Sequence, residues 1–198
     1  MGKGTKNTYT IVLAIILVAS LAMLFFENVD AITGHATEGS TVSNVTIQSF
    51  LSIQMSDDLT DGIVFEDVLT LPTTDQNATK NYNLTGETTG YWITVSNDSN
   101  SKVDFCLKAS GDMVSSGGDR IGLGNETYTN SVISNSTSPN VVDQASMTDS
   151  YAKTASAVDE GTSNYYRFWL DIPAAQASGT YTNNVNFKGV TQGNNCGE

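Results

Sequence analysis

The chain has 198 residues, a net charge of −12 at neutral pH and only 15% charged residues. This length allows one domain of ordinary size besides a targeting segment. The acidity argues against nucleic acid as a partner, because no basic patch is available to displace the counterions of phosphates.

An apolar stretch near the N-terminus predicts export. Residues 11–26 read IVLAIILVASLAMLFF without a charge, and Lys3 and Lys6 precede them. As a helix this stretch extends about 24 Å, somewhat short of the roughly 30 Å hydrocarbon core of a membrane. The positive residues keep the first end in the cytoplasm, so everything after the stretch is expected outside the cell.

The fate of residues 1–31 has three alternatives. Val29-Asp30-Ala31 carries small residues at the positions that a signal peptidase reads, which predicts cleavage after Ala31. The segment can instead stay as a membrane anchor, or be a pilin-type leader cut just before the apolar run. In each case the protein is expected to be secreted or anchored at the cell surface. Residues 32–43 are small and polar, as in a linker.

Alternating apolar and polar residues from position 44 onward predict β-strands with one face in water. The predicted strands lie around Val45–Met55, Ile63–Val68, Tyr91–Val95, Val103–Lys108, Tyr165–Ile172 and Tyr181–Lys188. Residues 111–149 alternate only weakly. We expect about eight or nine short strands in one all-β domain over 44–190, followed by a tail over 191–198. The expected fold is a two-sheet β-sandwich, Ig-like or jelly-roll-like, after one N-terminal hydrophobic helix.

Two cysteines in an exported chain predict one disulfide, between Cys106 and Cys196. Cys106 alternates with the apolar residues of its strand and is therefore expected to point outward. Cys196, in the tail, is free to fold back over that outer surface. The closed loop of about ninety residues would contribute roughly 4 kcal/mol to stability.

Six Asn-X-Ser/Thr triplets are candidate glycosylation sites, each near a predicted turn or strand end. They begin at Asn44, Asn77, Asn83, Asn97, Asn125 and Asn135. Triplets of this kind also arise by chance in a chain rich in Ser, Thr and Asn, so they indicate rather than establish a glycoprotein.

The side chains available for chemistry are few, and we expect no enzyme. The one histidine, His35, falls in the linker, which excludes a Ser-His-Asp or Cys-His arrangement inside the domain. Carboxylates at Asp57, Asp58 and Asp61 form a candidate Ca²⁺ site, although Leu59 breaks the EF-hand spacing. A carboxylate pair for glycoside hydrolysis is a distant alternative, because nothing in the sequence selects two partners.

Two tryptophans are candidates for stacking on sugars. Trp92 and Trp169 both fall on the predicted wet faces of their strands. Coverage by a loop or by another subunit is the alternative for exposed aromatic residues of this kind.

The segment YYRFWLDIPAAQASGTYTNNVNFKG at 165–189 resembles the last two strands of secreted archaeal β-sandwich proteins. Their pattern, W-L-x-x-P-x-x-x-x-x-G-T-Y-x-x-x-V-x-F, is matched here from Trp169 to Phe187. The segments ITGHATEGSTVSNVTI and VDFCLKASGD are similar to exported, uncharacterised proteins of small-genome archaea. This resemblance implies a surface β-sandwich without an assigned activity.

At the level of architecture the chain also resembles TasA/camelysin-type fibre subunits and archaeal bundling pilins. That resemblance implies self-assembly in which an N-terminal segment, here Thr41–Met55, adds as a strand to the next subunit. We therefore expect a structural or adhesive protein of the cell envelope, either anchored or assembled into a filament. The alternative is an extracellular module that binds carbohydrate, such as envelope glycans.

Overall fold

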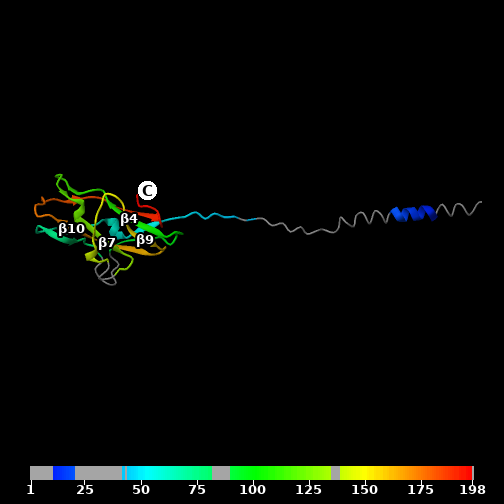
Figure 1. Ribbon diagram of the computed structural model, residues 1–198, viewed down its shortest axis with the longest axis horizontal. Helices are drawn as coiled ribbons and strands as arrows, with labels where there is room; N and C mark the ends of the chain where they lie inside the picture. Colours follow the sequence, from blue (N-terminus) through cyan, green and yellow to red (C-terminus); the bar gives the residue numbers. More distant parts are fainter. Residues whose placement is uncertain (1–10, 21–41, 43, 82–89, 135–138, 198) are drawn as a thin grey trace, which may run out of the picture. The chain divides into compact units, whose positions relative to one another are not determined.

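The computed structural model describes residues 11–20, 42, 44–81, 90–134 and 139–197. The chain divides into two compact units, Met1–Thr46 and Ile47–Glu198. In the first unit, residues 11–20 form an α-helix with exposed side chains, drawn in blue in Figure 1. No helix among the described residues is both long and apolar enough to cross a membrane. The rest of the predicted export segment, the cleavage position after Ala31 and His35 lie outside the described residues.

The described part of the second unit is β-rich, with short helical turns between strands. Its strands are β1 (Ile53–Met55), β2 (Thr73–Asn77), β3 (Tyr91–Val95), β4 (Val103–Ala109), β5 (Met113–Ser115), β6 (Arg120–Ile121), β7 (Glu126–Ser131), β8 (Ala145–Ser146), β9 (Ala152–Val158), β10 (Ser163–Ile172), β11 (Tyr181–Thr182) and β12 (Val185–Thr191). Its helical elements are α2 (Asp57–Asp61), η1 (Leu123–Asn125) and η2 (Val141–Asp143).

These strands form three antiparallel sheets. The six-stranded sheet has the order β1-β3-β10-β7-β8, and β2 also pairs with β10. A three-stranded sheet has the order β12-β4-β9, and a second one has the order β11-β5-β6. The long strands β10 and β4, both labelled in Figure 1, each have a paired strand on both sides.

One hydrophobic cluster joins the six-stranded sheet to the β12-β4-β9 sheet. Tyr91, Phe105, Tyr166 and Phe168 are all fully buried in it. Phe187 of β12 packs edge-to-face on Tyr166 of β10, with 5.4 Å between ring centroids. Burial of each such side chain stabilises the fold by roughly 1.5–3 kcal/mol, so these aromatic residues account for much of the attachment between the sheets.

The most strictly alternating segments of the sequence are strands in the structure. The predicted strands at 91–95, 103–108, 165–172 and 181–188 correspond to β3, β4, β10 and the pair β11 and β12. The prediction was wrong at Ile63–Val68, where only an isolated bridge between Phe65 and Ala78 forms. The first predicted strand shortens to β1, and β2 was not predicted.

The helix α2 interrupts the chain directly after β1. Ser56 caps it, since its hydroxyl accepts a hydrogen bond from the backbone N–H of Leu59 at 3.2 Å. The same hydroxyl donates to the carbonyl of Gly90 at 2.9 Å, which ties the cap to the start of β3. The helix ends at Gly62, whose φ of 114° favours glycine.

The outer face of β10 is covered, and the predicted exposure of Trp169 was wrong. Only 3% of Trp169 is exposed. Its cross-strand partner Thr127 donates a hydrogen bond to Gln144, which in turn donates to Asp75 of β2. Arg167, on the same face, donates to the carbonyl of Pro139 at 2.8 Å. The segment from Pro139 to Gln144 therefore crosses this face and excludes water from it.

Candidate functional site

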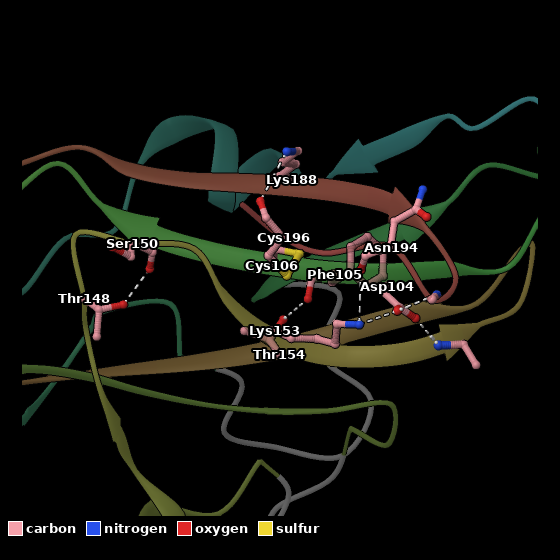
Figure 2. Close-up of a disulfide and its surroundings, with 12 residues drawn as sticks. Asp104, Phe105, Cys106, Thr148, Ser150, Lys153, Thr154, Lys188, Asn194 and Cys196 are labelled. Carbon is pink, nitrogen blue, oxygen red and sulfur yellow. Dashed lines mark hydrogen bonds and ion pairs between the residues drawn. A yellow bond between two sulfur atoms is a disulfide. The ribbon is translucent and has the colours of Figure 1, made fainter. Parts of the chain in front are cut away.

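The disulfide between Cys106 and Cys196 closes the C-terminal tail, defined here as residues 192–197, over the outer face of β4 (Figure 2). The pairing agrees with the sequence prediction, and the two Cα atoms lie 5.8 Å apart. Cys106 lies outside the hydrophobic cluster that contains its neighbours Phe105 and Leu107, yet the tail leaves only 1% of it exposed. A disulfide of this kind is compatible with an oxidising location outside the cell.

Asp104 lies on the same face of β4, two residues before Cys106, and is 2% exposed. Its Oδ2 accepts hydrogen bonds from Lys153 Nζ at 2.6 Å and from the backbone N–H of Gly193 at 3.0 Å. Its Oδ1 accepts from the backbone N–H of Ala157 at 2.8 Å. One carboxylate thus connects β4, β9 and the tail.

Two of the hydrogen bonds to Asp104 come from residues with a positive φ angle. Ala157 has a φ of 55°, a conformation that costs free energy in a residue other than glycine, and β9 changes register against β4 in this region. Gly193, with a φ of 89°, begins the turn that carries the chain back toward Cys196. The carboxylate stabilises both positions because it accepts the N–H group of each.

The electrostatics of this carboxylate favour its charged form. Burial alone raises the pKa of Asp104, but the Lys153 ammonium and the two backbone N–H groups outweigh that effect and hold the pKa below its ordinary value. Lys188 adds a further contact to the tail, donating to the carbonyl of Cys196 at 3.2 Å. The disulfide and these hydrogen bonds together hold the tail against β4, beside a carboxylate whose charge is compensated by its donors.

A second candidate site is a cavity of about 260 Å³ at Glu126, another buried carboxylate among the described residues. It is bounded by α2 and the segment that follows it, by β5 and β7, and by the chain from β11 into β12. Its lining residues are Leu59, Gly62, Ile63, Phe65, Met113, Glu126, Tyr181, Thr182, Asn183, Asn184, Val185 and Phe187.

Glu126, the first residue of β7, is 2% exposed. Its Oε2 accepts a hydrogen bond from Asn183 Nδ2 at 2.6 Å, and no other side-chain hydrogen bond to it is found among the described residues. Burial raises the pKa of Glu126, and the hydrogen bond from Asn183 lowers it by less. The cavity therefore has an acidic wall whose charge is only partly compensated.

The three carboxylates proposed for Ca²⁺ all belong to α2. Within the described parts of the chain, no three acidic, histidine or cysteine side chains gather as a metal ion would require. Asp58 Oδ2 accepts from the backbone N–H of Gly90 at 2.6 Å, and Lys80 lies 3.7 Å from its Oδ1. Asp57 and Asp61 are exposed. The structure thus gives Asp58 a role in holding the start of β3.

The two candidate stacking residues differ in burial: Trp169 is buried and Trp92 is half-buried. Trp92 lies beside Tyr165 across the β3–β10 ladder, with 6.2 Å between ring centroids. Of the candidate glycosylation residues, Asn44, Asn77 and Asn97 are exposed and Asn125 is half-buried, whereas Asn83 and Asn135 lie outside the described residues.

The comparisons with known proteins identify no relative of this chain. No family model, curated protein or solved structure matches this chain. The resemblances to archaeal surface proteins, fibre subunits and bundling pilins therefore stay predictions from the sequence.

Sequence reasoning missed both buried carboxylates. Asp104 alternates with apolar residues in the predicted strand Val103–Lys108, which places it on the face expected in water, although an acid beside a cysteine in an apolar strand could have indicated a buried ion pair. Glu126 follows a Gly-rich turn, and no local pattern marks it. Its partner Asn183 is 57 residues away in sequence.

Proposed function

We propose that this protein is a non-enzymatic structural or adhesive component of the cell envelope, exported through its N-terminal apolar segment. The disulfide over β4 and the β-rich domain support a role outside the cytoplasm. We also infer that the domain is a two-sheet sandwich, in which the six-stranded sheet and the β12-β4-β9 sheet face one another across the shared cluster of aromatic residues.

The observation that carries the proposal is the exposed, extended segment before β1. Residues 44–50 have no helix or strand assignment, and Val45 and Ile47 are 86% and 79% exposed. Both belong to the face that Leu51, Ile53 and Met55 continue in the sequence. Apolar side chains that alternate along an extended backbone are suited to adding a strand to another sheet.

The second unit, Ile47–Glu198, holds the end of this segment in place through Asn100. Asn100 accepts from the backbone N–H of Phe50 at 2.7 Å and donates to the carbonyl of Gln48 at 3.0 Å. The backbone N–H of Asn100 donates to the carbonyl of Phe50 at 3.2 Å. These hydrogen bonds fix Gln48 and Phe50 to the second unit, so the residues that precede them are joined to the domain at a defined point.

A sheet edge is available to receive such a strand. Among the described residues, β12 pairs with β4 and has no strand on its other side. An edge strand presents a row of N–H and C=O groups to a second chain. We propose that residues 42–50 of one copy pair with a sheet edge such as β12 in the next copy, which yields a filament or an anchored surface layer.

Electron microscopy and sedimentation of the full chain test this proposal. The wild-type protein should assemble into filaments, and Ile47→Asp should abolish assembly because a charge replaces the inserted apolar side chain. Leu69→Asp is the matched control, since Leu69 is 94% exposed but lies outside the segment. Monodisperse wild-type monomers under all conditions, or filaments that persist in Ile47→Asp, would contradict the proposal.

Export is tested separately by the mature N-terminus. The intact mass of protein from its native host distinguishes cleavage after Ala31 from a retained anchor, and it also reports glycans on the Asn-X-Ser/Thr triplets. Intact, unmodified protein in the soluble cell interior would contradict an envelope role.

The alternative function, carbohydrate binding, is favoured by one observation. Trp92 and Tyr165 form a half-buried aromatic pair on one face of the six-stranded sheet. Rings at such positions can stack on sugars. Screening of the full chain against a glycan array, with Trp92→Ala as the comparison, tests it. If the wild-type protein binds no glycan on the array, with or without Ca²⁺, this alternative is excluded.

A further inference from the structure

We propose that the cavity beside Glu126 is a binding site for a small organic cation, an ammonium group attached to an apolar body. This inference does not depend on the proposed envelope function. It starts from a carboxylate that is 2% exposed, lines a cavity of about 260 Å³ and has one hydrogen-bonding side chain, Asn183, at 2.6 Å.

The charge balance of the cavity points to a cation. None of the described residues that line it is Lys, Arg or His. A buried carboxylate is normally paired with a positive group, because desolvation of an isolated charge is costly. Asp104 in the same domain has such a partner in Lys153. The missing counter-charge at Glu126 is what an ammonium ligand would supply through a charge-assisted hydrogen bond.

Part of the remaining wall suits an apolar body with aromatic contacts, beside the polar residues Thr182, Asn183 and Asn184. Phe65, Tyr181 and Phe187 line the cavity, and Leu59 and Met113 add aliphatic surface. Aromatic faces attract ammonium groups, and this attraction strengthens where water is excluded. The volume lies just below the range of pockets for drug-sized ligands, so a single-ring amine is the appropriate size.

Several hydrogen-bonding groups of the cavity are already bonded within the protein, which leaves fewer of them for a sugar. A sugar needs several groups free to bond with its hydroxyls. The hydroxyl of Tyr181 already donates to the carbonyl of Ala177 at 2.7 Å and accepts from Gln176 at 2.8 Å. Asn183 Nδ2 donates to Glu126 and to the carbonyl of Gly111. The backbone N–H of Asn184 is likewise bonded, to the hydroxyl of Ser110.

A metal ion is also a poor fit. Ca²⁺ takes six to eight oxygen ligands, with several from carboxylates. Glu126 is the one acidic side chain among the described residues that line the cavity. A monovalent organic cation needs a single carboxylate, together with contacts to the apolar walls.

Calorimetric titration of the full chain, kept in solution with a mild detergent, tests the proposal with a matched pair of probes. Benzylammonium and benzyl alcohol have similar size and differ in charge. Benzylammonium should bind with an affinity about tenfold or more above that of benzyl alcohol, because one charged hydrogen bond distinguishes them. Glu126→Gln should remove this difference, whereas Glu160→Gln, at an exposed acid, should leave it unchanged.

Chemical-shift mapping on the wild-type protein keeps the test independent of how the variants fold. Benzylammonium should shift the resonances of residues 181–185 and the side-chain amide of Asn183. Equal affinity for the two probes would overturn the proposal, as would no binding of benzylammonium, shifts confined to other surfaces, or an unchanged affinity in folded Glu126→Gln. Tighter binding of a monosaccharide or of Ca²⁺ at the same residues would overturn it as well.

Discussion

The described part of the domain contains two buried carboxylates in opposite situations. Asp104 accepts from a lysine and from two backbone N–H groups, and its pKa is held below the ordinary value. Glu126 accepts from one amide and borders a cavity, and burial raises its pKa. Both are 2% exposed, so burial alone does not explain the difference. The desolvation of each carboxylate, set against the number and charge of its donors, decides which protonation state folding favours.

This difference separates a structural site from a candidate binding site. The charge of Asp104 stabilises both β9 and the tail, since groups of both donate hydrogen bonds to it. At Glu126 the charge is under-compensated, which costs stability and leaves the group available for a ligand. Substitutions at both carboxylates and their partners test this difference, beginning with the covalent bond beside Asp104.

The largest effect is expected on removal of the disulfide. The double variant Cys106→Ser/Cys196→Ser should lose about 4 kcal/mol of unfolding free energy, because the bond closes a loop of 90 residues in the unfolded chain. Denaturant unfolding of the oxidised wild type and the variant measures this loss. A loss below about 1 kcal/mol would show that Asp104 and the tail contacts suffice without the bond.

Substitution of Asp104 should have the next largest effect. Asp104→Asn leaves Lys153 without its carboxylate and weakens the bonds from Ala157 and Gly193, so we expect a loss of about 3 kcal/mol at pH 7. Thermal or denaturant unfolding measures it, with Asp98→Asn, at an exposed acid, as the control.

The pH dependence at Asp104 gives a second readout. Because the folded pKa is depressed, the stabilisation is present above the unfolded value of about 3.9 and is lost as the pH falls through the folded pKa. Asp104→Asn should therefore flatten the loss of stability below about pH 4. If Asp104→Asn loses as much stability as the wild type when the pH falls below about 4, the charge of Asp104 does not stabilise the tail.

Substitution of Lys153 should cost less unfolding free energy than substitution of Asp104. Its side chain is 38% exposed, so water can solvate the site when the ammonium is removed. Lys153→Met keeps much of the aliphatic side chain and leaves the carboxylate with two backbone donors. We expect a loss of about 1–2 kcal/mol in denaturant unfolding. A loss as large as that of Asp104→Asn would show that the ammonium, rather than the backbone N–H groups, compensates the carboxylate.

How much of this could be predicted from the sequence depends on how local each signal is. β4 and β10 were predicted over 103–108 and 165–172, because large apolar residues occupy alternate positions along both segments. β9, AKTASAV, was missed because its small and polar residues give no alternation. The disulfide was predictable because the chain has only two cysteines.

The two carboxylates could not be predicted because their environments come from distant parts of the chain. The lysine that compensates Asp104 is 49 residues away in sequence, and the amide that reaches Glu126 is 57 residues away. The burial of Trp169 was missed for the same reason. The segment that covers its face, from Pro139 to Gln144, shows no pattern that assigns it to β10.

The smallest effect, and the one with opposite sign, is expected at Glu126. Glu126→Gln keeps an oxygen that can accept from Asn183 and removes a charge that burial disfavours. The variant should therefore gain about 1 kcal/mol of unfolding free energy at pH 7. Asn183→Ala is the matched comparison, and it should lose stability because it deprives the carboxylate of its amide donor.

The sign of the pH dependence separates Glu126 from Asp104. Because the folded pKa of Glu126 is raised, wild-type stability should fall as the pH rises from about 4.3 through the folded value. The advantage of Glu126→Gln should grow over that window and vanish below it. Benzylammonium should reduce the advantage by stabilising the charged carboxylate of the wild type. A variant that is less stable than wild type at pH 7 without ligand would mean that the charge at Glu126 is already compensated, and the contrast with Asp104 would be lost.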